Sequence, residues 1–240
     1  MAIEIFNRFE NKYLVSQAEY ERLLIDLSPK MRLDKHNLDG KMYKIYNTYY
    51  DTADDNVIRS ALEKPTFREK IRLRSYEVVK KPDDIVFVEI KRKYDGEVNK
   101  RRTKMNLGEA KRFLAGAKIN PQTHMNPQVV RELEEIVERE QPLVPKVHIS
   151  YERMALFDKS NDDLRISFDH NIITRRHNVE LDRDDPGVKL LPSDKYLMEV
   201  KVRRTMPLWL IEIINQYNLK PISFSKYGKE YINKLKENYV

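Results

Sequence analysis

The sequence predicts an α+β protein: an eight-stranded antiparallel β-barrel with helices packed on its outside. The main observation is a set of segments in which apolar and charged residues alternate with the period of two expected of a β-strand. In the clearest segment Arg72, Arg74 and Tyr76 share one face, while Ile71 and Leu73 share the other. Amphipathic segments with helical spacing lie between these strands. A barrel with a charged inner face and an apolar, helix-covered outer face accounts for both patterns.

The N-terminal part begins with a predicted strand over residues 3–15, in which charged and apolar residues alternate. Ser16 is a suitable N-cap for a helix over residues 17–27, and Glu19 stands at the capping-box position. A strand dense in tyrosine is expected over residues 43–50. Strand, helix and strand therefore follow one another in this part of the chain.

The next part predicts a short helix over residues 54–62 and then a meander of three strands. The strands are expected over residues 67–76, 85–94 and 98–105. Asp95-Gly96 separates the last two and is a strong signal for a tight hairpin turn.

The C-terminal half alternates helices and strands in the same way. A helix begins at Asn106 or Gly108 and runs to Ala115, and a second is expected over residues 128–139. Three further strands are expected over 146–157, 164–173 and 196–203, followed by helices over 207–217 and 225–237. No internal repeat or flexible linker divides the sequence, so we expect one domain over residues 1–240.

Composition restricts the possible functions. Among 240 residues the net charge is +7, which favours an anionic partner. The absence of cysteine excludes disulfides and thiolate metal sites, and the five histidines show no metal-binding spacing. The sequence shows no secretion signal and no apolar run long enough to span a membrane, so we expect a cytoplasmic protein.

The charged faces of the predicted strands supply the candidate site residues. Each alone is compatible with an ordinary solvated strand face, but the same asymmetry in many strands favours a charged barrel interior. Like charges on neighbouring strands repel, so carboxylates or a bound anion must offset them. Phosphate suits this role because Arg and Lys match its oxygens. The inward candidates are Arg8, Lys12, Arg72, Arg74, Lys91, Lys93, Arg153, Arg165 and Lys201, with Glu10, Glu89 and Glu199.

The carboxylates have two possible roles. Glu199, Glu10 and Glu89 could be salt-bridge partners, or they could bind a divalent cation together with phosphate oxygens. Asp169, on the same face as Arg165, is a weaker candidate. No GxSxG or GxxxxGK[ST] motif occurs, and only six glycines are present. Side chains, and not backbone amides, would therefore have to hold an anion.

An ordered set of short motifs resembles a known family. The motifs are Arg8-Phe-Glu10-Asn-Lys12-Tyr13, Tyr49-Tyr50-Asp51-Thr52, Arg72-Leu-Arg74, Phe87-Val-Glu89-Ile-Lys91, Tyr151-Glu-Arg153, Glu199-Val-Lys201 and Ser223-Phe-Ser225-Lys226-Tyr227. In this order they resemble VTC domains, the polyphosphate polymerase modules of the CYTH, or triphosphate tunnel metalloenzyme, superfamily. Each motif alone is weak, and the resemblance spans nearly the whole chain.

The resemblance implies a fold and a reaction. The family has an eight-stranded antiparallel tunnel that binds triphosphate groups with Mg²⁺ or Mn²⁺, and its polymerase branch moves the γ-phosphate of ATP onto polyphosphate. By motif, the phosphate-binding residues would be Lys12, Arg72, Arg74, Lys91, Arg153, Arg165 and Lys226, with Lys93 and Lys201 as additions. Glu199 would be the metal ligand and would complete the catalytic set.

One departure from the superfamily pattern affects the expected reaction. The superfamily begins with ExExK, whereas this chain has Arg8 at the first position. The exchange of a carboxylate for a cation favours polyphosphate binding over a two-metal hydrolase. Hydrolysis of tripolyphosphate or nucleoside triphosphates and binding without turnover remain alternatives. Nucleic-acid binding is the least favoured, because the basic residues alternate within strands and no RNP-like motif occurs.

Overall fold

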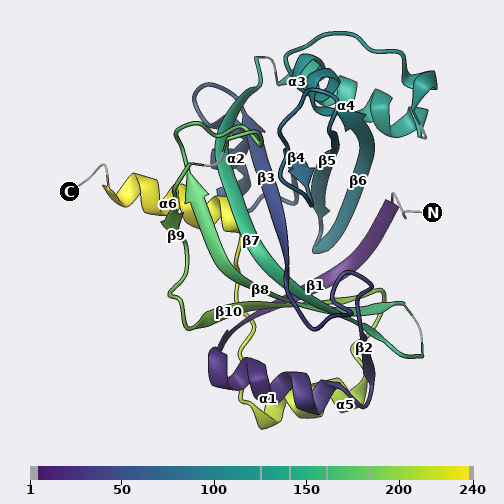
Figure 1. Ribbon diagram of the computed structural model, residues 1–240, viewed down its shortest axis with the longest axis vertical. Coiled ribbons are helices and arrows are strands. Elements are labelled where there is room, and N and C mark those ends of the chain that lie inside the picture. Colours follow the sequence, from purple (N-terminus) through teal and green to yellow (C-terminus); the bar gives the residue numbers. More distant parts are fainter. Residues whose placement is uncertain (1–4, 125, 141, 161, 184, 238–240) are drawn as a thin grey trace.

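The structure is a computed structural model that describes residues 5–124, 126–140, 142–160, 162–183 and 185–237, without the side chains of residues 5–8. It is an antiparallel sheet with helices around it (Figure 1). The strands are β1 (Ile5–Ser16), β2 (Met31–Leu33), β3 (Tyr43–Asp51), β4 (Phe67–Ser75), β5 (Ile85–Tyr94), β6 (Glu97–Asn106), β7 (Val144–Asp158), β8 (Leu164–Arg175), β9 (Val188–Lys189) and β10 (Lys195–Val202). The helices are α1 (Gln17–Leu27), α2 (Asn56–Leu62), α3 (Leu107–Leu114), α4 (Pro127–Arg139), α5 (Leu208–Gln216) and α6 (Lys226–Glu237), with a short 3₁₀ helix, η1 (Pro121–Thr123).

Eight of the strands pair in a ring, as the alternating pattern predicts. The order is β7-β3-β4-β5-β6-β1-β10-β8, and β8 pairs back onto β7. The pairing of β1 with β6 is short and covers Ile5–Arg8, whereas β1 pairs with β10 from Phe9 to Ser16. The two short strands β2 and β9 extend the sheet beside β7 and β8 and were not expected from the sequence. Three and two residues are too few to show a period of two.

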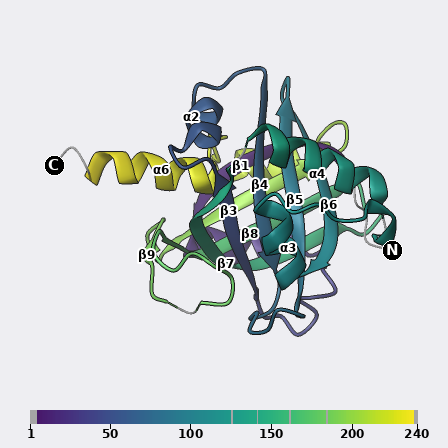
Figure 2. The same ribbon diagram turned by 90° about the horizontal axis from the view of Figure 1, so that it is seen from above.

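The helices cover the outer face of the ring in separate groups (Figures 1 and 2). Helices α1 and α5 pack on β1, β7, β8 and β10, where Leu23 and Leu210 are fully buried. Helices α3 and α4 pack on β4, β5 and β6, where Phe113 and Leu133 are buried. The apolar side of most strands therefore faces the helices, and their charged side faces the interior of the ring. The inner side of β3 and β7 also carries apolar residues such as Ile45 and Ile149.

Local signals in the sequence explain where elements begin and turn. Ser16 caps α1: its Oγ accepts a hydrogen bond from the Glu19 amide, and the Glu19 carboxylate accepts one from the Ser16 amide, which confirms the expected capping box. Asp95 and Gly96 both have positive φ angles, of 42° and 87°, as the tight turn between β5 and β6 requires.

Helix α6 lies at one end of the ring, beside α2. The Tyr227 hydroxyl donates a hydrogen bond to Asp51 at the end of β3, at 2.9 Å. Asp51 also accepts hydrogen bonds from the amides of Val57 and Ile58 in the first turn of α2. The residues just before α6 pair with β1, because the Ile222 amide donates to the carbonyl of Lys12. These contacts place the first residue of α6 against the interior of the ring.

Candidate functional site

The inner face of the ring is lined by the charged side chains of β1, β4, β5, β6, β7, β8 and β10. Register brings them together across neighbouring strands. Arg72 of β4 is opposite Glu89 of β5, which is opposite Arg102 of β6. On the other side of the ring Lys12 of β1 is opposite Glu199 of β10. The site is therefore built from residues far apart in the sequence.

Glu89 is the centre of the first charge group. It has no exposed surface, and its Oε2 accepts hydrogen bonds from two guanidinium nitrogens of Arg72, at 2.9 and 2.7 Å. Lys100 contacts it at 3.2 Å, Arg74 at 3.7 Å and Arg102 at 3.9 Å. Four cations thus surround one buried carboxylate.

Tyrosine and asparagine side chains hold the two arginines of β4 in place. Arg72 donates to the Tyr49 hydroxyl at 3.0 Å. Arg74 donates to the side-chain oxygen of Asn47 and to the Tyr151 hydroxyl, each at 2.9 Å. These neutral partners orient both guanidinium groups without removing their charge.

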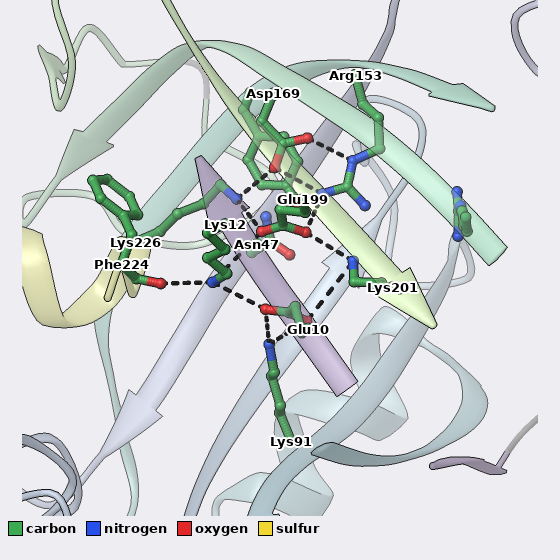
Figure 3. Close-up of polar contacts among 12 residues, drawn as sticks. Glu10, Lys12, Asn47, Lys91, Arg153, Asp169, Glu199, Lys201, Phe224 and Lys226 are labelled. Atoms are coloured by element: carbon green, nitrogen blue, oxygen red, sulfur yellow. Dashed lines mark hydrogen bonds and ion pairs between the residues drawn. The ribbon is translucent and has the colours of Figure 1, made fainter. Parts of the chain in front are cut away.

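Glu199 is the centre of the second charge group, with Asp169 beside it (Figure 3). Glu199 lies 2.7 Å from Lys201, 3.2 Å from Lys226 and 3.3 Å from Arg153. Arg153 and Lys226 also contact Asp169, at 2.6 and 2.5 Å. The two carboxylates and three cations form one connected network on β7, β8, β10 and the start of α6.

Glu10 joins the second group from β1. Its carboxylate contacts Lys12 at 3.0 Å and Lys91 at 3.2 Å, and Lys201 lies 3.9 Å away. Lys12 also lies 3.7 Å from Glu199 and donates to the carbonyl of Phe224 at 2.6 Å. Glu10 and Glu199 therefore share Lys12 and Lys201, whereas Glu89 has a different set of cations.

Electrostatics keep these groups ionised despite burial. Burial opposes ionisation of Glu89 and Glu199, but the surrounding Arg and Lys side chains hold the pKa of each carboxyl well below its usual value. Burial also opposes the charge of Lys226, but Asp169 and Glu199 raise the pKa of its ammonium group above the usual value. All three remain charged at neutral pH.

Excess positive charge is concentrated where β4 pairs with β5. Lys70 is directly opposite Lys91, and Arg68 is directly opposite Lys93. The Lys70 ammonium group donates to the Ser225 hydroxyl at 2.9 Å. Burial, together with Lys91, Lys12 and Arg68, lowers the pKa of Lys70 to about 7. Like charges opposite one another destabilise a sheet, so these positions favour a bound anion.

Most of the predicted site residues meet in these groups. Lys93 lies on the same face near the end of β5, and Arg165 lies at the opposite rim, where it contacts Asp34 at 3.1 Å. The backbone of Arg8 pairs with Val98, but its side chain lies outside the described part of the structure. Lys226 belongs to a helix and still reaches the interior, 4.5 Å from the centre of the Tyr151 ring.

The sequence-based set omitted some of the inner-face cations that the structure describes, among them Lys70, Lys100 and Arg102. Alternation gave a signal for all three: Lys70 shares a strand face with Arg72, and Lys100 and Arg102 share a face of β6, although the charged Arg101 between them weakens the pattern there. The contacts of Asp169 with Arg153 and Lys226 give this weaker candidate a central place.

The carboxylates suit a divalent metal only in part. Among the described residues no three His, Asp or Glu side chains form a group that could hold a metal ion. Glu10 and Glu199 share two cations, Lys12 and Lys201, whereas Glu89 contacts neither, so the three predicted ligands do not form one group. A pair of carboxylates fits Mg²⁺ or Mn²⁺ when phosphate oxygens supply further ligands.

The chain matches the family model of the VTC domain over residues 7–233. No curated protein matches it significantly. Similar solved structures include a candidate adenylate cyclase from Bacillus halodurans, with a TM-score of 0.56 and 16% identity, covering 93% of this chain and 96% of the other. Another is a candidate adenylyl cyclase from Hippeastrum described as having a dominant triphosphatase activity, with a TM-score of 0.48, 15% identity and coverage of 94% and 93%.

The first of these structures agrees with the fold described above, at an identity that supports the fold alone. None of the helices in the described ranges is both long and apolar enough to span a membrane. The interior of the ring carries an excess of positive charge. Four cations around Glu89 and four around Glu199 leave positive charge that the carboxylates do not neutralise.

Proposed function

The chain belongs to the VTC domain family, and from this we propose that it is a metal-dependent phosphotransferase that moves the γ-phosphate of ATP onto a polyphosphate chain. The observation that carries the proposal is the excess of cations over carboxylates around Glu89 and Glu199. Uncompensated buried charge is costly, and a bound triphosphate or polyphosphate would offset it.

The arrangement of the cations supports transfer by positioning and charge neutralisation. Arg72, Arg74 and Arg153 would bind phosphate oxygens through their guanidinium groups, and Lys12 and Lys226 would act as point charges. In the transfer the bond between the γ-phosphorus and its bridging oxygen breaks, and ADP leaves with the electron pair. A terminal oxygen of polyphosphate forms the new bond to phosphorus. Fixed cations are suited to stabilising the charge that develops on these oxygens.

Glu10 and Glu199 would hold the divalent cation, Mn²⁺ or Mg²⁺, together with phosphate oxygens. When bound, the ion neutralises phosphate charge. Support comes from their positions on the paired strands β1 and β10 and from the two lysines they share, Lys12 and Lys201. Those lysines would turn towards phosphate when a cation occupies the carboxylates.

The direct test is incubation of the purified protein with ATP and Mn²⁺, following ADP, free phosphate and polyphosphate length on a gel. ADP together with a lengthening polyphosphate ladder is the expected result. If ADP formed with an equal amount of free phosphate, the reaction would be hydrolysis and not transfer to polyphosphate. If no turnover occurred but tripolyphosphate still raised the melting temperature, the protein would bind polyphosphate without catalysing its synthesis.

A matched pair of variants links turnover to the inner face. Arg72→Met removes an inward guanidinium and should abolish polyphosphate synthesis. Arg92→Met removes a guanidinium from the outer face of the neighbouring strand, where it pairs with Glu69 and Glu132, and should retain it. Circular dichroism checks that both variants fold. Equal activity of the two would contradict a role for the inner face.

A further inference from the structure

A row of aromatic side chains lies at the rim of the ring opposite α6. It consists of Tyr43 at the start of β3, Tyr76 directly after β4 and Phe87 near the start of β5. The ring centres of Tyr43 and Tyr76 are 6.3 Å apart, and those of Tyr76 and Phe87 are 5.7 Å apart. The side chain of Tyr76 is 37% exposed, so part of its surface is open to solvent. We call these three residues the aromatic rim.

The aromatic rim is continuous with the cations of the inner face. The guanidinium of Arg74 lies 5.9 Å from the centre of the Tyr76 ring, and that of Arg102 lies 4.8 Å from the centre of the Phe87 ring. Arg102 also donates to the Tyr76 hydroxyl at 3.5 Å. Aromatic surface and phosphate-binding cations therefore meet at one place.

Spacing along β4 relates the aromatic rim to a bound triphosphate. Arg72, Arg74 and Tyr76 follow one another at every second residue, which is a step of about 7 Å along an extended chain. A nucleotide whose phosphates lie at Arg72 and Arg74 would bring its nucleoside next to Tyr76. At the other end of the ring Lys70 is bonded to Ser225, just before α6, and cations continue along the strands.

We propose that the aromatic rim binds the base of the nucleoside triphosphate by stacking, with Tyr76 as the main contact. This rests on the proposed function and adds to it a nucleoside subsite and an orientation of the nucleotide in the ring. The base lies at the aromatic rim, the triphosphate points inward along β4, and the γ-phosphate is directed towards Lys70 and α6. Purines present more surface for stacking than pyrimidines, and stacking discriminates little between adenine and guanine.

Binding to two ligands separates the aromatic rim from the phosphate site. Affinities for ATP and for inorganic tripolyphosphate are measured by calorimetry in EDTA, so that no turnover occurs. Tyr76→Leu should weaken ATP binding about tenfold, because one stacked ring is lost. The same variant should leave tripolyphosphate binding unchanged. GTP should bind the wild-type protein within a few-fold of ATP.

Two control variants separate stacking from other roles of Tyr76. Tyr76→Phe keeps the ring and removes the hydroxyl that Arg102 contacts, and it should bind ATP as the wild type does. Tyr94→Leu removes an exposed tyrosine at the other end of the sheet, 64% exposed on β5, and should change neither affinity.

Several results would overturn the proposal. An equal loss of ATP and tripolyphosphate binding in Tyr76→Leu would mean that Tyr76 only positions Arg74 and Arg102. Unchanged ATP binding in this variant would remove the subsite. A wild-type protein that binds neither ligand would contradict the proposed function itself, and the nucleoside subsite with it.

Discussion

Lys70 and Lys91 lie directly opposite each other in the pairing of β4 and β5, and both face the interior of the ring. Lys91 has a carboxylate partner in Glu10, whereas Lys70 donates to the neutral hydroxyl of Ser225. A sheet that places two ammonium groups in this relation loses stability when no anion is bound. The arrangement is useful when a polyanion occupies the interior.

Removal of the Lys70 charge should stabilise the free protein. Lys70→Met should raise the free energy of unfolding by up to about 1 kcal/mol at low salt, because a like-charge pair is relieved. The same change should weaken binding of tripolyphosphate. Urea denaturation in phosphate-free buffer measures the first effect and calorimetry the second. Lys35→Met, at an exposed position, is the control and should change neither the unfolding free energy nor the binding of tripolyphosphate. A loss of stability in Lys70→Met would show that its charge has a compensating partner.

The stabilising effect of Lys70→Met should depend on pH. The pKa of Lys70 is lowered from 10.5 to about 7, chiefly by burial. Between these values the unfolded chain holds a proton on Lys70 that the folded chain lacks, so stability rises with pH. The advantage of the methionine variant should therefore be largest below pH 7 and shrink towards pH 10.5. If the difference in unfolding free energy between Lys70→Met and the wild type stayed constant over this range, the pKa of Lys70 would not be lowered in the folded protein.

Glu89 should be essential for the stability of the free protein. Glu89→Gln leaves Arg72, Arg74 and Lys100 buried without their carboxylate, which should lower the free energy of unfolding by about 3 kcal/mol. Tripolyphosphate should restore part of this loss, because it supplies the missing negative charge. Denaturant titration with and without tripolyphosphate measures both effects. Glu97→Gln, at an exposed position of β6, should be neutral. If the two variants were equally stable, the cations would not depend on Glu89.

Glu199 should compete with phosphate for cations when no metal is present. Glu199→Gln should therefore strengthen metal-free binding of tripolyphosphate and abolish the additional effect of Mn²⁺ on that binding. Calorimetry with EDTA and then with Mn²⁺ gives both values. Glu212→Gln on the exposed surface of α5 is the charge-matched control. An unchanged response to Mn²⁺ would exclude Glu199 as a metal ligand.

The strands and the apolar or charged side of each were predictable because alternation is a local property. Alternation placed Arg72, Glu89 and Glu199 on inner faces correctly. It could not give the grouping of the carboxylates, because strand order and register decide that Glu10 meets Glu199 and that Glu89 does not.

Residues outside the barrel strands were harder to place. Lys226 reaches the interior because α6 begins at one end of the ring, and that position depends on contacts such as Tyr227 with Asp51. The motif resemblance identified Lys226. Because Lys226 lies in a helix, strand alternation could not indicate that its side chain reaches the interior. The aromatic rim was similarly hidden, since Tyr43, Tyr76 and Phe87 lie far apart in the sequence and meet only through strand pairing.

The position of β1 in the ring also affects how the molecule folds. β1 pairs with β6 and with β10, so residues near Phe9 must wait for partners such as Val202 that follow almost 200 positions later. Such non-local pairing makes folding slow, because long loops must close before their contacts form. Glu10 and Lys12 therefore meet Glu199 and Lys201 only after most of the chain is available. A shortened chain that ends before β10 would lack Glu199, Lys201 and Lys226, as well as α5 and α6, and would never assemble the charged interior.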